Sequence, residues 1–387
     1  MNSKQFETAK MCLKVVTPVN ISDGIVLGAK DYLYDSRRQK VFFLNLHQWH
    51  MFIYKHMLLE KYESYLANFR DKQSLLEWLR MQGYDIDDVR TVITSEAQAT
   101  VNLMDNEKKK TLNDINRHIQ QPDGSLYVPG SSIKGVFRTA ILYSLLQKRQ
   151  DIKVKYWRQI QEKISSNYFK PYRDFNKLIS DLENELLHTL RLVDGDIHSN
   201  NAVYSAMRGL QVSDTYASRN MQTAILQKVD GGFDKFGKAS PKKLPIFREC
   251  MLPKAELFFD VKIEKAVMST IGINSVDDLL KATHSFFAAV TDLLQQAFGK
   301  EYQEAFQGVA ASNMFLGGNT GFLSKTLLAM LAPDKDTAKN TIKVLLDKSF
   351  KNHKHLLRDK IIAPRTLKCT NYNGKLMLMG VAEVRKV

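Results

Sequence analysis

Apolar positions along the chain recur at two different spacings. Residues 12–19 (CLKVVTPV) and 255–264 (AELFFDVKIE) are rich in β-branched and aromatic side chains, which predicts strands. In the segments 45–82, 151–192 and 276–298, apolar residues return about every 3.6 positions, which predicts amphipathic helices. Further helices are expected within 71–120 and near 337–351, and further strands at 125–128, at 208–216 and in the closing segment GKLMLMGVAEV.

The same order of elements is expected twice along the chain. Each half is predicted to have the order strand, helix, strand, glycine-rich loop, helix, strand, and 387 residues are enough for two domains. The expected division is residues 1–205 and 206–387. The second half also contains a long loop at about 229–248 that is rich in Gly, Lys and Pro.

The first glycine-rich loop lies in YVPGSSIKGVFRTAIL, residues 127–142. Pro129 and Gly130 are expected to end a strand, and Ser131 or Ser132 is expected to cap the helix that follows. Free N–H groups in the first turn of such a helix form an anion site.

Three further residues of this helix suit a phosphate. Lys134 and Arg138 are four residues apart and therefore share one face of the helix, where both can reach the same anion. Gly135 has no side chain, so a sugar-phosphate backbone could approach it closely. A capped helix with solvated Lys and Arg would give the same pattern.

Nucleotide enzymes do not fit either glycine-rich loop. The spacing from Gly130 to Gly135 is that of a P-loop, but Val136-Phe137 replaces the required Lys-Ser/Thr pair. In the second loop, FLGGNTGFLSKTLLAM, Gly321 and Lys325 are also wrongly spaced. No G-x-G-x-x-G follows a strand, and no nucleophile elbow surrounds Ser132.

The charge of the chain favours a polyanionic partner. There are 56 Lys and Arg against 41 Asp and Glu, a net charge of +15 with a pI near 9.4. Basic residues concentrate in 235–248 and 335–368, although a charge run is often only a solvated face. Nucleic acid is therefore the first expectation, and phosphate and sugar contacts are expected to dominate because no RNP1 motif is present.

Cysteine usage and hydropathy favour a cytoplasmic protein. The three cysteines are odd in number and far apart, which fits a reducing compartment. No stretch approaches 18 consecutive apolar residues, and the first residues lack the pattern of a secretory signal. No membrane partner is expected.

The residues that could support catalysis do not form a set in the sequence. His47 and His50 make at most half of a zinc site, and Asp194-Gly195-Asp196 with His198 is typical of a turn. His353 and His355 lie among lysines and are expected on a basic surface. We expect no metal, no cofactor and no catalytic residue, while a nuclease assembled from distant residues stays open.

Four segments of the chain resemble the RAMP superfamily of CRISPR effector proteins. GSSIKG at 130–135 is similar to that family's internal signature, and GGNTGFLSKT at 317–326 to its C-terminal glycine-rich loop. TPVNISDG at 17–24 resembles the segment after the first strand, and VSDTY at 212–216 the strand that opens the second half. Their order most resembles the type III-A (Csm) subunit that caps the 3′ end of the guide RNA.

The resemblance implies an α+β fold with two ferredoxin-like (RRM-like) domains, antiparallel sheets and helical insertions. It implies a non-catalytic CRISPR RNA-binding subunit that holds the 3′ part of the guide, caps the backbone filament and takes part in crRNA maturation and antiviral defence. The loop at 229–248 would correspond to a thumb hairpin across the guide–target duplex. Its expected partners are that RNA, the neighbouring backbone subunit and maturation nucleases.

One departure from the family pattern bears on catalysis. Asn20 stands where relatives often have a histidine, which some processing endonucleases of the superfamily use catalytically. This favours RNA binding without cleavage. A RAMP endoribonuclease that processes CRISPR RNA, and an unrelated enzyme for a phosphorylated small molecule, remain the alternatives.

The expected RNA-binding residues lie in the two loops and on the thumb-like segment. They are Ser131, Ser132, Lys134, Gly135, Arg138, Gly317, Gly318, Asn319, Thr320, Lys325, Arg219, Lys242 and Arg248.

Overall fold

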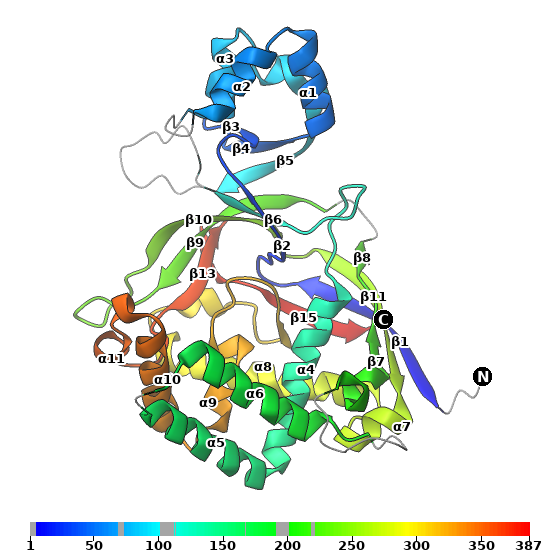
Figure 1. The fold of residues 1–387 in the computed structure, drawn as a ribbon, viewed down its shortest axis with the longest axis vertical. Coiled ribbons are helices and arrows are strands. Elements are labelled where there is room, and N and C mark those ends of the chain that lie inside the picture. Colours follow the sequence, from blue (N-terminus) through cyan, green and yellow to red (C-terminus); the bar gives the residue numbers. More distant parts are fainter. Residues whose placement is uncertain are drawn as a thin grey trace.

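The structure is a computed structural model that describes residues 5–68, 73–100, 112, 114–166, 168–190, 201–217 and 221–387. The chain forms two sheets. Helices cover the sheets on the side opposite a small lobe formed by residues 32–100 (Figure 1). This is the α+β class expected from the sequence. Among the described residues, no helix is long and apolar enough to cross a membrane.

The first sheet has the strand order β12-β15-β1-β11-β7, and β8 also pairs with β11. Every pairing in it is antiparallel. One face is buried, because alternate residues of β1 such as Met11 and Leu13 are fully covered. Its strands are β1 (Phe6–Val15), β7 (Leu210–Val212), β8 (Tyr216–Ala217), β11 (Glu256–Glu264), β12 (Met314–Phe315) and β15 (Val381–Lys386).

The second sheet has the order β2-β6-β10-β9-β5-β4-β3, and β13 joins it by pairing with β9 and β14. Two of its contacts, β6 with β10 and β5 with β9, are parallel, and the others are antiparallel. Its strands are β2 (Ser22–Leu27), β3 (Tyr32–Asp35), β4 (Lys40–Leu44), β5 (Ile93–Thr100), β6 (Ile115–His118), β9 (Thr223–Gly231), β10 (Lys242–Met251), β13 (Leu367–Tyr372) and β14 (Lys375–Leu378).

Capping side chains mark the start of some of the helices. Ser275 accepts a hydrogen bond from the backbone N–H of Asp278 at the start of α8, and Asp334 does the same for Thr337 at α10. The helices are α1 (Leu46–Lys55), α2 (Leu59–Ala67), α3 (Leu75–Met81), α4 (Gly130–Lys148), α5 (Gln150–Ser165), α6 (Pro171–Leu187), α7 (Lys265–Met268), α8 (Val276–Phe298), α9 (Leu328–Leu331), α10 (Lys335–Ser349) and α11 (His355–Arg358). Short 3₁₀ turns are η1 (Ile86–Val92), η2 (Ala202–Tyr204), η3 (Ala206–Gly209), η4 (Ser269–Ile271), η5 (Gln303–Phe306), η6 (Leu323–Lys325) and η7 (Lys351–His353).

A lobe formed by residues 32–100 stands apart from the rest of the molecule, which we call the body (Figure 1). In the lobe, β3, β4 and β5 extend the second sheet, and α1 to α3 enclose an aromatic core. Trp49 is fully buried there and meets Tyr62 and Trp78 edge-on, with ring centroids 5.9 and 6.4 Å apart. The lobe therefore has a hydrophobic core of its own.

The structure corrects two expectations about elements. Among the described residues of 71–120, the helical elements end with η1, and β5 and β6 follow, both of which pair within the second sheet. Residues 125–128 form no strand; they contain one isolated bridge, between Leu126 and Gln120.

Both sheets combine strands from the two sides of residue 205. In the first sheet, β1 lies between β11 and β15. In the second, β5 and β6 pair with β9 and β10. The division at 205/206 stays a prediction.

Candidate nucleic-acid interface

The first glycine-rich loop leads into α4, but its serines do not cap the helix. Pro129 is the N-cap residue and makes no side-chain capping bond. Instead, the Asp214 carboxylate accepts a hydrogen bond of 2.7 Å from the backbone N–H of Gly130. The expected serine cap is therefore wrong, and a carboxylate from a loop 84 residues away already occupies the first free donor.

Lys134 and Arg138 share one face of α4, as their spacing predicts. Lys134 donates from Nζ to the backbone oxygen of Leu210 at 2.6 Å, and burial together with the charge of Arg138 lowers its pKa. Arg138 is exposed and lies 3.5 Å from the Glu183 carboxylate. Both cations thus have partners within the chain, while Arg138 stays open to solvent.

The two glycines of this loop have different surroundings. A Cβ on Gly130 would lie 2.4 Å from the backbone oxygen of Val212, so only glycine fits this contact between α4 and β7. A Cβ on Gly135 would meet nothing within 4 Å. Because glycine inside a helix costs about 0.5–1 kcal/mol relative to alanine, packing does not explain Gly135. Ser131 is exposed and Ser132 half-buried beside it.

The second glycine-rich loop packs closely against Asn20, in the segment between β1 and β2. Gly317 has φ of +82°, and a Cβ on it would lie 2.2 Å from the backbone oxygen of Asn20. The Gly318 N–H donates to that same oxygen at 2.7 Å. A Cβ on Gly318 would lie 2.9 Å from Nη1 of Arg248. These two glycines therefore let the loop reach Asn20 and Arg248.

The rest of this loop is shaped by its own side chains. Asn319 has φ of +61°, a conformation that asparagine tolerates better than most residues, and its buried Nδ2 has no hydrogen-bond partner in the described part of the chain. Thr320 is buried and accepts a hydrogen bond of 3.0 Å from Ser324. The helix that follows, α9, has only four residues, so this loop does not present the expected helix start to an anion.

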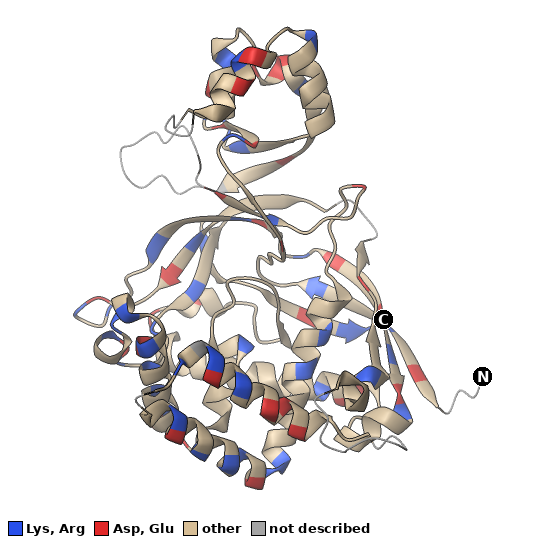
Figure 2. Ribbon diagram, in the orientation of Figure 1, with Lys and Arg blue, Asp and Glu red and all other residues tan. Residues whose placement is uncertain are grey.

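Arg248, Lys325, Lys228 and Lys368 form a cation cluster around this loop. Lys228, Arg248 and Lys368 come from the adjacent strands β9, β10 and β13, and Lys325 from η6. Within the described residues, their ion pairs all go to Asp230, which lies 3.7 Å from Lys228 and 3.0 Å from Lys368. Figure 2 shows basic segments on these strands.

The electrostatics of the cluster favour an anion. Burial and the neighbouring cations Lys368 and Arg248 lower the pKa of Lys228. Lys325 is exposed, yet partial loss of water and the charge of Arg248 lower its pKa too. Burial lowers the pKa of Arg248, whose Nε has no hydrogen-bond partner among the described residues. A phosphate would supply the missing negative charge and acceptors.

The remaining expected residues lie elsewhere. Arg219 lies outside the described residues. Lys242 is the first residue of β10 and is exposed. The segment 229–248 forms an antiparallel hairpin of β9 and β10, and Phe236 in its turn region is 76% exposed beside Lys235.

Two buried polar residues on β6 and β10 have no role predicted from the sequence. His118 is fully buried, accepts at Nδ1 from the Ile21 N–H at 3.0 Å and faces the Tyr127 oxygen at 3.3 Å from Nε2. Burial lowers its pKa to about 4, so it is neutral at pH 7. Glu249 is also buried, and its carboxylate accepts from the His118 N–H at 3.1 Å. Only the pairing of β6 with β10 brings them together.

The described histidines do not gather into a metal site. His47 and His50 are both exposed on α1. His355 is buried, with Nδ1 2.8 Å from the Asp359 carboxylate, so it is not part of a basic surface as expected. The described residues contain no group of three His, Cys, Asp or Glu side chains that could hold a metal ion. Asp194, Asp196 and His198 lie outside them.

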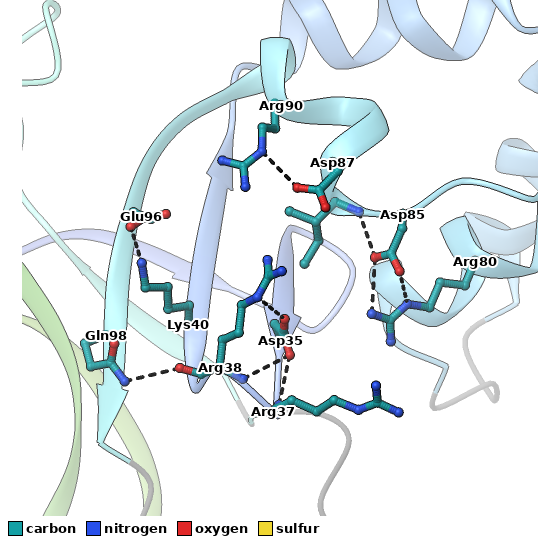
Figure 3. Close-up of polar contacts among 11 residues, drawn as sticks. Asp35, Arg37, Arg38, Lys40, Arg80, Asp85, Asp87, Arg90, Glu96 and Gln98 are labelled. Carbon is teal, nitrogen blue, oxygen red and sulfur yellow. Dashed lines mark hydrogen bonds and ion pairs between the residues drawn. The ribbon is translucent and has the colours of Figure 1, made fainter.

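The lobe provides a contrast to the cluster. Residues 32–100 contain nine Lys and Arg and nine Asp and Glu, so the other 47 basic and 32 acidic residues carry the whole net charge of +15. Figure 3 shows lobe charges paired with one another: Arg80 with Asp85 at 3.1 Å, Arg90 with Asp87 at 2.9 Å, and Lys40 with Glu96. The lobe therefore offers little excess positive charge to a polyanion.

Comparisons with known proteins agree on one group of relatives. A protein of Mycobacterium tuberculosis named CRISPR system Cms protein Csm5 is 26% identical over 98% of this chain and 97% of its own length. The protein of the same name from Enterococcus italicus is 23% identical over 88% of this chain and 85% of its own length.

Solved structures show the same fold. A chain of a Csm-crRNA-target RNA ternary complex of a type III-A CRISPR-Cas system matches 98% of this chain and 100% of its own length, with a TM-score of 0.67 and 18% identity. The Csm5 of T. onnurineus matches 96% of this chain and 99% of its own length, with a TM-score of 0.59 and 18% identity. The family profile described as the RAMP superfamily matches residues 12–321, which include GSSIKG and the start of the second loop. This chain belongs to the RAMP superfamily.

Proposed function

We propose that this protein is a CRISPR RNA-binding structural subunit of a type III-A (Csm) interference complex. The cation cluster carries the proposal: four basic side chains have one carboxylate among their partners in the described part of the chain, and an exposed lysine stands at its edge. Relatives named Csm5 cover nearly the whole chain, and a fold match comes from a complex that contains crRNA and target RNA.

In this proposal the phosphates of the guide RNA lie against the second glycine-rich loop. Arg248 and Lys325 bind phosphate oxygens, and the amide of Asn319 donates to the same strand. The exposed face of α4, with Gly135 and Arg138, forms a second contact to the backbone. Such contacts position RNA without reading its sequence.

The finer role follows from the resemblance of the motifs. The chain binds the 3′ part of the guide and ends the backbone filament, and the hairpin of β9 and β10 lies across the guide–target duplex. Its partners are the neighbouring backbone subunit and maturation nucleases, and it works in the cytoplasm. The boundary between its two RRM-like halves lies at residues 205/206.

Binding without cleavage is part of the proposal. His118 lies on β6, which pairs with β10. Both of its ring nitrogens have partners inside the core, and it is neutral, so it has no free nitrogen for proton transfer. Asn20, at the position where a histidine would suggest a nuclease, is an amide with no titratable proton.

The test is binding of the purified chain to a labelled single-stranded RNA across a salt series, with the same samples examined for cleavage. We expect intact RNA and a log–log salt slope of several units, at about −0.7 for each phosphate contacted. The variant Lys325→Gln should lose affinity and part of the slope. Lys177→Gln on α6 removes an exposed charge elsewhere and should bind like wild type.

Two outcomes would contradict the proposal. Cleavage at a fixed position would identify an endoribonuclease of the same superfamily instead. The other outcome is weak binding that does not depend on salt in the wild type and in both variants. It would mean that the cluster does not bind RNA phosphates.

A further inference from the structure

Asn20 is fully buried and connects four segments of the chain. Its backbone oxygen accepts from the Gly318 N–H at 2.7 Å. Its side-chain Nδ2 donates to the Glu249 oxygen on β10 at 2.8 Å and faces the Asn116 oxygen on β6 at 3.4 Å. Its Oδ1 accepts from Nη1 of Arg248 at 3.0 Å. A single residue between β1 and β2 thus contacts the glycine-rich loop, β6 and β10, and on β10 it binds Arg248.

These bonds fix the orientation of the amide. Because the Nδ2 end is bound to backbone oxygens of two strands, the Oδ1 end must point at Arg248. The guanidinium is held at Nη1, while its buried Nε remains without a partner among the described residues. An arginine held by one nitrogen keeps its other donors for a ligand.

The amide is also the only common side chain of this size that suits the position. A carboxylate could not donate to the Glu249 and Asn116 oxygens, and it would neutralise Arg248 in a partly buried site. An alanine would leave both the Nη1 donor and two backbone oxygens without this partner.

We propose that Asn20 is a positioning residue, which aims the Arg248 guanidinium and the Gly317-Gly318 turn at one phosphate of the RNA. This inference rests on the proposed function of the same site. A purely structural Asn20 would stabilise the fold but would have no special coupling to Arg248 in RNA binding.

The test is a double-mutant cycle with Asn20→Ala and Arg248→Ala, in which RNA affinity and salt slope are measured on folded protein. Asn20→Ala alone should weaken binding about 10-fold and reduce the slope by about 0.7, the share of one phosphate contact. In the Arg248→Ala background, Asn20→Ala should have no further effect. Asn20→Asp should weaken binding at least as much as Asn20→Ala, because it pairs with Arg248.

A second variant covers the case in which Asn20 variants do not fold. Gly318→Ala places a methyl group 2.9 Å from Nη1 of Arg248 and 3.4 Å from Oδ1 of Asn20, so it crowds the contact between these two side chains without removing either. It should weaken RNA binding in the wild-type background and have no effect once Arg248 is alanine.

The possible results separate the two proposals. If Arg248→Ala and Lys325→Gln both bind RNA like wild type, the proposed function of this site is wrong. If those variants weaken binding but Asn20→Ala and Gly318→Ala do not, or weaken it equally in both Arg248 backgrounds, then only the positioning role of Asn20 is wrong.

Discussion

The lobe and the cation cluster use charged side chains in opposite ways. In the lobe, Arg80, Arg90 and Lys40 each meet a carboxylate, and the net charge of residues 32–100 is zero. In the cluster, Arg248 and Lys325 have no carboxylate partner among the described residues, and their pKa values are lowered. The lobe charges are neutralised within the lobe, whereas the cluster keeps positive charge that suits the anion we propose for it.

The largest expected effect comes from removing the two cations that have no carboxylate partner among the described residues. Arg248→Ala with Lys325→Ala should cost ~3 kcal/mol or more of RNA binding free energy, a loss of about 100-fold, because two charge-assisted hydrogen bonds disappear. Arg80→Ala with Arg90→Ala removes the same charge from the lobe and should leave binding within about twofold. Filter binding at fixed salt measures both. Equal losses in the two double variants would erase the distinction between lobe and cluster.

A smaller effect concerns the stability of the protein in acid, to which the buried His118 contributes. The pKa of His118 is about 4 in the folded protein against 6.5 when exposed, so the unfolded chain binds an extra proton between these values. The contribution of His118 should therefore lower the free energy of unfolding by roughly 2–3 kcal/mol as the pH drops from 6.5 to 4. Urea unfolding at several pH values measures it.

The control for this prediction is His118→Asn, which keeps an acceptor for the Ile21 N–H but does not titrate in this range. Its unfolding free energy should depend less on pH over the same interval. If the variant and the wild type have the same pH dependence, His118 does not carry the acid sensitivity of the body.

The smallest expected effect is at Gly135. Gly135→Ala should stabilise the protein by about 0.5–1 kcal/mol, because alanine favours the helix and its methyl group meets nothing within 4 Å. The same methyl group should weaken RNA binding a few-fold if the sugar-phosphate backbone approaches this face. Unfolding in urea and RNA binding are measured on the same preparation. Gained stability with unchanged binding would leave α4 outside the interface.

Elements with local signals could be predicted from the sequence. The helix expected at 276–298 matches α8 because Ser275 caps it and its apolar stripe is regular. The strand β5, ITSEAQAT, was missed because it is largely polar, and its pairing with β4 and β9 decides its structure. The helix cap at Gly130 was assigned wrongly because Asp214 reaches it through the tertiary fold.

The candidate site was predicted in part for the same reason. Arg248, Lys325 and the glycines of the second loop could be found from motifs and charge, although as members of separate segments. Lys228 had no distinguishing signal, and Lys368 was only the last residue of the basic run 335–368, since only the pairing of β9 with β10 and β13 places them together. Asn20 stood out only because relatives often have a histidine at that position. Its hydrogen bond to Arg248 could not be predicted, because the two residues are 228 positions apart in the sequence.

The most direct test of the account is to map where RNA touches the protein. A single-stranded RNA containing 4-thiouridine would be crosslinked to the full chain by light, and the modified peptides identified by mass spectrometry. The account predicts crosslinks in 242–251 and 317–331, with the lobe at 32–100 unmodified. Crosslinks concentrated in the lobe, with none around the second glycine-rich loop, would contradict it.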